Sequence, residues 1–170
     1  NDVYSMKKSI TIFTVFLAIA ISLHAYEIMQ EKTPVGEIKI LKLPERLALE
    51  ADSQRSYFQA DNGLFRKLFR YTNAKGVSMT TPVEAEINPG KMRFFVGKGD
   101  RLKNINSTTE VKVKKIPPVV VLTVGIRGSY SENRFRENEK LLISQIMINK
   151  EYEAIGKAYA VYWNGPFVPG

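Results

Sequence analysis

The sequence predicts an α+β fold with an antiparallel sheet. Segments that alternate apolar and polar residues outnumber helical segments, and short turns join them into hairpins. The order strand, helix, strand occurs twice along the chain, although no repeat is visible residue by residue. Together these observations favour a single α+β domain over residues 26–170.

Composition excludes several classes of protein. The 170 residues include no cysteine, which rules out disulfides, cysteine nucleophiles and thiolate metal sites. The only histidine is His24, which leaves the predicted domain without a histidine for a catalytic triad or a zinc site. The net charge of +8 favours anionic partners in general, and the alternative, which we prefer, is that it only keeps the surface soluble and self-repelling. We expect no nucleic-acid partner, because neither a dense Lys/Arg cluster nor a nucleic-acid module occurs.

Residues 1–25 have the pattern of an N-terminal extension and a secretory signal. Lys7 and Lys8 precede an apolar run over residues 10–23, which is shorter than the about 20 residues that a membrane span needs. We expect translation to begin at Met6 and cleavage to export the domain to a bacterial periplasm. The alternative is an uncleaved segment that anchors the protein to the membrane.

Two strands are predicted before the first helix. Residues 36–43 alternate with period two, Pro44 interrupts the alternation, and residues 46–51 resume it. One long strand with a bulge at the proline is the alternative.

Residues 61–87 form the most clearly patterned stretch, a helix followed by a strand. Apolar residues up to Tyr71 have helical spacing, Asp61 or Asn62 can cap the start, and the turn residues after Tyr71 end the helix. The alternation that follows predicts a strand with one buried face. Glu84 and Glu86 fall on its polar side, so we expect exposed carboxylates there and no acid–base pair.

The second half repeats this order. A turn at residues 88–90 joins the preceding strand to one at residues 91–96, which predicts a hairpin. After a polar loop, residues 110–115 form a strand, and residues 119–126 form a β-branched run that is typical of a central strand.

A second helix and a closing strand end the pattern. Ser129 or Ser131 can cap the helix, whose apolar set includes Phe135, Leu142 and Ile146. Residues 152–163 then alternate as a strand. The sequence stops in a turn after this strand, so we expect a truncated C-terminus and a missing edge strand.

Two motifs carry a resemblance to a known family. The first helix has the form GxFRxLFxY from Gly63 to Tyr71, and the following strand contains MTTPV from Met79 to Val83. Residues 36–41, 128–131 and 162–167 provide supporting segments. This pattern resembles the SOUL heme-binding protein family over nearly the whole predicted domain.

The resemblance implies both a fold and a function. It implies a distorted antiparallel β-barrel, built from two βαββ-like halves with two flanking helices. Such a barrel is similar to that of effector-binding regulators that hold flat, hydrophobic or cationic drugs. It also implies non-covalent binding of heme or another tetrapyrrole. Some family members are thought to use an axial histidine, which this domain lacks, so iron would be ligated by Tyr, Met or Lys, or by no residue.

The candidate ligand site combines apolar and cationic side chains, because heme needs a slot for its ring and cations for two propionates. The candidates for contacting the ligand are Phe65, Arg66, Phe69, Arg70, Met79, Tyr162 and Trp163. The alternative for the apolar residues is a place in the core, and for the two arginines a solvated surface.

We therefore predict a non-catalytic, monomeric protein that binds heme or a related flat, hydrophobic ligand in a shallow apolar site. The alternative is a scaffold or protein-interaction domain that keeps the fold without binding heme. An enzyme is disfavoured, because the sequence contains no phosphate loop, no GxSxG motif and no metal-ligand spacing.

Overall fold

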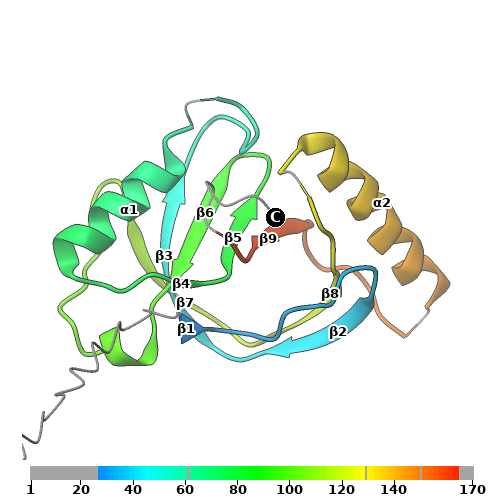
Figure 1. Ribbon diagram of the computed structural model, residues 1–170, viewed down its shortest axis with the longest axis horizontal. Helices are drawn as coiled ribbons and strands as arrows, with labels where there is room; N and C mark the ends of the chain where they lie inside the picture. Colours follow the sequence, from blue (N-terminus) through cyan, green and yellow to red (C-terminus); the bar gives the residue numbers. More distant parts are fainter. Residues whose placement is uncertain (1–26, 61, 129, 150, 165–170) are drawn as a thin grey trace, which may run out of the picture.

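The computed structural model describes residues 27–60, 62–128, 130–149 and 151–164, which Figure 1 shows as ribbons. The signal-like segment at residues 1–25 and the stretch 165–170 lie outside these ranges, so cleavage and the missing edge strand stay predictions. Within the described ranges, no helix is both long enough and apolar enough to cross a bilayer.

A five-stranded antiparallel sheet forms the larger part of the fold. Its order is β7 (Lys112–Ile116), β3 (Arg46–Asp52), β6 (Lys91–Phe95), β5 (Val83–Glu86) and β9 (Tyr159–Tyr162). The predicted hairpin is confirmed, because β5 pairs with β6. Strand β9 pairs with the other side of β5, so the end of the chain joins the sheet of the first half.

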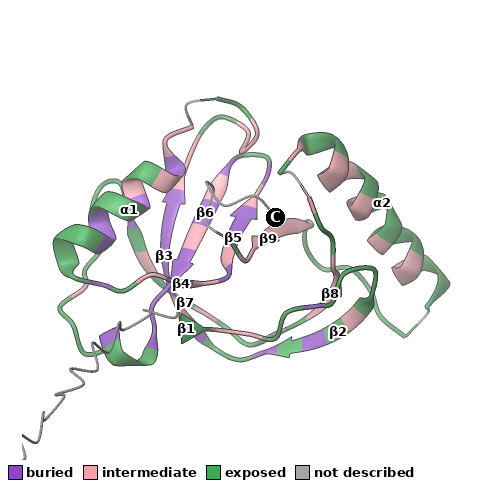
Figure 2. Cartoon of the chain, in the orientation of Figure 1, coloured by how far each residue is buried: buried purple, intermediate pink, exposed green. Residues whose placement is uncertain are grey.

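Helix α1 (Leu64–Lys75) covers one face of this sheet (Figure 1). Leu64 and Leu68 are fully buried, and together with Tyr71 they pack against Leu49 of β3 and Phe94 of β6. Figure 2 shows that burial concentrates here, on the inner side of α1 and along β3, β5 and β6. The core of the protein therefore lies between α1 and the sheet.

The ends of α1 lie close to those that the sequence predicts, but the N-cap is Gly63 and the last helical turn includes residues 73–75. Asn62 Oδ1 accepts a hydrogen bond from the Leu64 N–H at 3.1 Å, which satisfies an amide of the first turn. Asp61, the other candidate, lies outside the described residues. The helix ends at Gly76, whose φ of 62° is a left-handed conformation that a side chain would disfavour.

Two short ladders accompany the main sheet. Strand β2 (Ile38–Leu43) pairs antiparallel with β8 (Val119–Val124), and β1 (Glu27–Ile28) pairs parallel with β4 (Thr80–Thr81). Helix α2 (Glu132–Ile148) flanks the β2–β8 ladder at the right of Figure 1. Its cap is Ser131, whose Oγ accepts the Arg134 N–H at 3.4 Å.

Two details of the predicted sheet differ in the structure, and of the two alternatives for residues 36–51 the structure confirms two separate strands. The described residues form an α+β fold with two helices, but no ladder in them joins β2–β8 to the five-stranded sheet, so no barrel closes. Strands β2 and β3 belong to different sheets and are not one bent strand. Strand β8, expected inside a sheet, pairs only with β2 in the part of the chain described.

The strand predicted over residues 77–87 is divided in two. Pro82 has no backbone N–H to donate, and it separates β4 from β5. The two pieces pair with different partners: β4 with β1, and β5 with β6 and β9.

Glu84 corrects the expectation of exposed carboxylates on this strand. It is only 2% exposed, and its Oε1 lies 2.6 Å from Nη1 of Arg46, which is equally buried. Nη1 of Arg93 lies 3.6 Å from the other oxygen of Glu84, and Nε of Arg93 donates to Glu50 at 2.8 Å. We call Arg46, Glu50, Glu84 and Arg93 the charge ladder. It runs across β3, β6 and β5, and its residues alternate with those that face α1.

The charge ladder makes stability depend on pH. Burial raises the pKa of Glu50, but hydrogen bonds from Lys114 and Arg93 outweigh it and hold this pKa below its usual value of 4.5. A hydrogen bond from Lys112 likewise lowers the pKa of Asp52 from 3.8. A carboxyl group with a lowered folded-state pKa stabilises the fold above its unfolded pKa and loses that contribution as the pH falls.

We therefore expect the free energy of unfolding to be constant near neutral pH and to fall progressively below a pH of about 4.5. Urea unfolding at a series of pH values measures this. The Glu50→Gln variant should show a shallower fall, because the group that titrates has been removed. An equal slope in both proteins would contradict the assignment to Glu50.

Candidate functional site

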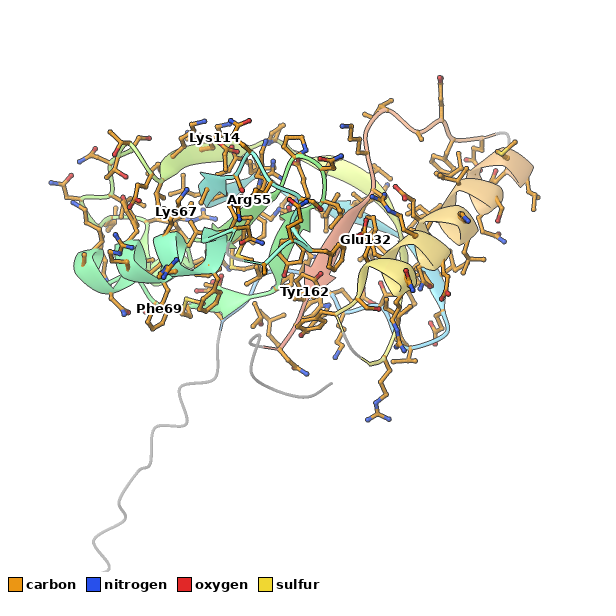
Figure 3. All side chains as sticks on the ribbon, turned by 90° about the horizontal axis from the view of Figure 1, so that it is seen from above. Arg55, Lys67, Phe69, Lys114, Glu132 and Tyr162 are labelled. Atoms are coloured by element: carbon orange, nitrogen blue, oxygen red, sulfur yellow. The ribbon has the colours of Figure 1, made fainter. Side chains whose placement is uncertain are left out.

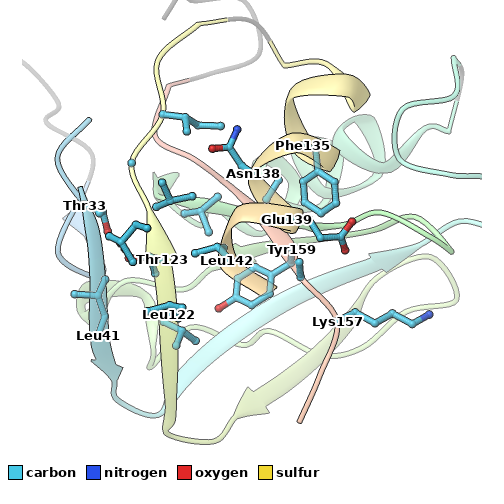
Figure 4. Close-up of a pocket in the computed structure, with 18 of the residues that line it drawn as sticks. Thr33, Leu41, Leu122, Thr123, Phe135, Asn138, Glu139, Leu142, Lys157 and Tyr159 are labelled. Carbon is cyan, nitrogen blue, oxygen red and sulfur yellow. The ribbon is translucent and has the colours of Figure 1, made fainter. Parts of the chain in front are cut away.

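A large open cleft lies between the β2–β8 ladder, helix α2 and strand β9 (Figure 4). Its volume is about 1950 Å³. Residues 119–124 of β8 line one side with β-branched and apolar side chains, and residues 159–162 of β9 line another. Helix α2 contributes Phe135, Leu142 and Ile146 from a single face, because their spacing places them on one side of the helix.

An aromatic cluster borders the cleft: its members Phe58, Tyr130 and Tyr162 line the cleft, and Tyr57 lies behind them against the core. The ring of Tyr162 lies 5.7 Å from that of Tyr57, nearly parallel to it, and 4.2 Å from that of Tyr130. Phe58 lies 5.2 Å from Tyr57 and 6.1 Å from Phe135 of α2, so the cluster reaches from β9 to the helix. Ring faces of this kind suit contact with a flat, apolar molecule.

The tyrosines of this wall stay protonated at neutral pH. Burial raises the pKa of Tyr162, and the neighbouring Tyr57 raises it further. Burial and the charge of Glu84 raise the pKa of Tyr159 to about 12.

Cationic side chains border the cleft on the side of α2. Arg134 donates to the backbone carbonyl of Arg127, and Arg136 lies 3.0 Å from Glu139 and 3.3 Å from Glu132. Lys157 donates to the Asn88 carbonyl at 3.2 Å. Arg136 is therefore paired with two carboxylates, whereas the contacts of Arg134 and Lys157, which also line the cleft, are with backbone carbonyls.

Two of the residues predicted from the sequence line the cleft. Tyr162 belongs to its aromatic wall, and Trp163 lies beside it, with the Lys32 ammonium 5.9 Å from the centre of its ring. The sequence signal that identifies them is the aromatic strand near the C-terminus.

The other five predicted residues lie elsewhere and do not line the cleft. Phe65 packs against the core, 5.5 Å from Phe94, and Phe69 stacks on it at 5.7 Å while remaining 44% exposed. Arg66 is exposed, and Arg70 lies 3.5 Å from Glu110 on the surface. Met79 packs against the same core as Phe65. Figure 3 labels Phe69 and Tyr162, which stand on different elements.

Sequence reasoning missed most of the cleft. The spacing of Phe135, Leu142 and Ile146 indicates an apolar face on α2, but periodicity does not say whether such a face is covered. The structure decides this, because none of the described side chains of α2 is fully buried.

The described residues offer no ready metal centre. In the ranges that the structure covers, no three His, Cys, Asp or Glu side chains are grouped so that they could hold a metal ion.

An α+β domain with an open apolar cleft, an aromatic wall and a cationic rim has the features of a binding protein for a hydrophobic small molecule. The family model described as "SOUL heme-binding protein" matches residues 23–170. The chain therefore belongs to the SOUL heme-binding protein family, which the two sequence motifs predict.

Comparison with solved structures bears on the fold alone. The crystal structure of the EcmrR C-terminal domain matches with a TM-score of 0.55 and 13% sequence identity, over 76% of this chain and 85% of that one. At this identity the match shows a shared fold and nothing further. No curated protein matches the sequence significantly.

Proposed function

We propose that the protein binds heme or a related flat, hydrophobic tetrapyrrole non-covalently in the cleft, without catalysing a reaction. The observation that carries the proposal is the aromatic wall of Phe58, Tyr130 and Tyr162, which lines the same cleft as the apolar side of α2. Membership of a heme-binding family supports the same class of ligand.

The cleft offers an apolar surface for the ring of a tetrapyrrole and positive charge for its propionates. The apolar side chains of β8 and α2 remove ring surface from water, which contributes about 25 cal/mol per Å² buried. Arg134 of α2 and Lys157, which line the cleft and have no carboxylate among the contacts named above, supply positive charge for propionates, because a charge-assisted hydrogen bond to a carboxylate is stronger than a neutral one.

We further propose that affinity rests on these contacts and not on an axial ligand to iron. Met79 packs against the core and does not line the cleft, and residues 26–170 contain no histidine or cysteine. A porphyrin without iron should therefore bind about as tightly as hemin.

A titration with matched variants tests the site. Hemin added to the full chain should shift the Soret band saturably at micromolar concentrations, and Phe69→Glu of α1 should leave this unchanged. Phe135→Glu of α2 should weaken binding about tenfold or more, because it places a charge on the apolar wall. Protoporphyrin IX fluorescence gives the iron-independent reading.

Two results would contradict the proposal. Loss of binding in Phe69→Glu but not in Phe135→Glu would move the site to α1, where the sequence first places it. No saturable shift with the intact, folded chain would favour the alternative, a scaffold that keeps the fold without heme. Circular dichroism of each variant checks that folding is preserved.

A further inference from the structure

A short loop at the end of the molecule away from α2 combines an exposed leucine with basic side chains (Figure 1). It begins with η1 (Lys98–Asp100), a single 3₁₀ turn that follows β6. We call residues 98–103 the basic loop. Leu102 is 99% exposed, and so are, as a class, the three cations of the loop, Lys98, Arg101 and Lys103. None of these residues lines the cleft, so the function proposed for the cleft does not account for them.

Hydrogen bonds hold the basic loop in place, although its outer side chains are exposed. Asp100 is only 6% exposed, and its Oδ2 accepts the Ser78 N–H at 2.6 Å. Lys103 Nζ pairs with the other oxygen of Asp100 and also donates to the Gly76 carbonyl at the end of α1. The loop is therefore tied to the domain with its acidic residue turned inward. Leu102 contacts almost none of the protein, so its apolar surface stays in water.

The outward surface of the basic loop is positively charged. Within the described ranges, neither Lys98 nor Arg101 forms an ion pair. Lys75 in the last turn of α1 adds a further cation, because the residue after it accepts the hydrogen bond from the loop. Asp100 is the only acid in residues 98–103, and it is buried. Positive charge around an exposed apolar side chain suits a partner that is anionic at its surface and apolar beneath, as a bilayer of acidic phospholipids is.

The first residue of β1 lies against the same loop. Both carboxylate oxygens of Glu27 accept the Lys98 N–H, at 3.0 and 3.2 Å. Gly97 makes room for this contact, because a Cβ at that position would collide with the carboxylate. Only residues 24–26 separate Glu27 from the apolar run at residues 10–23. A chain advances by at most about 3.6 Å a residue, so the run ends within roughly 15 Å of Glu27 and close to the basic loop.

We propose that the basic loop is a membrane-docking surface for a bilayer that contains anionic phospholipids. Leu102 inserts at the level of the headgroups, and Lys98 and Arg101 pair with the lipid phosphates around it. In the full chain the apolar run at residues 10–23 enters the same bilayer, so the domain is held at two neighbouring points. The cleft lies on the α2 side of the molecule, so docking leaves it open to a ligand.

A fluorescent label in the basic loop of the full chain tests this, since the chain contains no cysteine of its own. Gly99→Cys takes the environment-sensitive fluorophore NBD, because a side chain there meets nothing within 4 Å and Leu102 stays intact. Ile155→Cys, which is 94% exposed and follows α2, carries the same label as the control. On vesicles of phosphatidylglycerol and phosphatidylcholine, emission at residue 99 should shift to the blue and rise about twofold or more, whereas emission at residue 155 should stay as in buffer.

Two substitutions in the labelled chain separate the apolar contribution from the charged one. Leu102→Asp and Arg101→Glu should each weaken vesicle binding by about fivefold or more and reduce the blue shift at residue 99. Lys140→Glu makes the same change of charge at an exposed lysine of α2 and should leave both readings unchanged. Vesicles of phosphatidylcholine alone should give a weaker response, because they carry no net negative charge. Circular dichroism checks that each variant is folded.

The proposal is overturned if residue 99 does not respond to vesicles, if residues 99 and 155 respond equally, or if Leu102→Asp leaves the response unchanged. An equal response to neutral vesicles would overturn the assignment to anionic lipid. A change at residue 99 that needs no vesicles and grows with protein concentration would identify a second copy of the chain as the partner, and would also overturn it. These experiments contain no tetrapyrrole, so their outcome is separate from that of the hemin titration.

Discussion

Replacing Glu84 by alanine is expected to lower the free energy of unfolding by about 3–5 kcal/mol, because it leaves the Arg46 guanidinium buried without its counter-ion. Arg46 is 2% exposed and lies 2.6 Å from Glu84, so water cannot replace the lost carboxylate easily. Urea unfolding of the two proteins at neutral pH measures the difference.

Glu86→Ala provides the matched control on the same strand and the same face. Its side chain is 36% exposed and also pairs with Arg93, at 2.6 Å, so its loss should cost only about 1 kcal/mol. The double variant Arg46→Met/Glu84→Leu should recover most of the stability, because it removes both charges and keeps the volume. Equal losses of unfolding free energy for Glu84→Ala and Glu86→Ala would contradict the burial of the charge ladder.

Leu68→Ala is expected to destabilise the protein by about 2–5 kcal/mol, because it leaves a cavity between α1 and the sheet. Leu68 is fully buried and packs in the cluster that contains Leu49 and Phe94. The midpoint of urea unfolding should fall with little change in slope.

Phe69→Ala, the next residue on the same helix, is the control. Phe69 is 44% exposed and stacks on Phe65, so we expect a loss of less than about 1 kcal/mol. If Phe69→Ala were as costly as Leu68→Ala, α1 would bury a different face from the one described.

Several elements could be predicted from local patterns. The helical spacing around Leu64 and Leu68 identifies α1, and Gly76 marks its end, because these signals lie within a few residues of one another. The hairpin of β5 and β6 follows for the same reason, since a short turn brings its strands together.

The environment of Glu84 could not be predicted in this way. Alternation along β5 correctly divides its residues between two faces, and predicts nothing about what covers the second face. The Glu84 carboxylate is paired with Arg46 of β3, and β9 lies alongside β5, with Val161 as the residue paired with Glu84. Both are distant in sequence, so a polar face becomes the inside of the protein.

The candidate site likewise contains some residues that the sequence identifies and others that only the fold reveals. Tyr162 and Trp163 are candidates because they belong to an aromatic strand, and they line the cleft. Phe65 and Phe69 are candidates because α1 is strongly amphipathic, but they stack on each other and do not line the cleft. That amphipathic face is occupied by the core. Phe135 on the less clearly patterned α2 faces the cleft instead.

Motifs and periodicity are local properties of the chain, and they were enough to predict the family, the α+β class, the two helices and the absence of cysteine and histidine chemistry in residues 26–170. The packing of distant segments settles which apolar face is covered, which carboxylate is buried and where a cleft remains. Those outcomes depend on how β8, α2 and β9 lie against the first half, and such long-range pairing leaves no mark in any single segment.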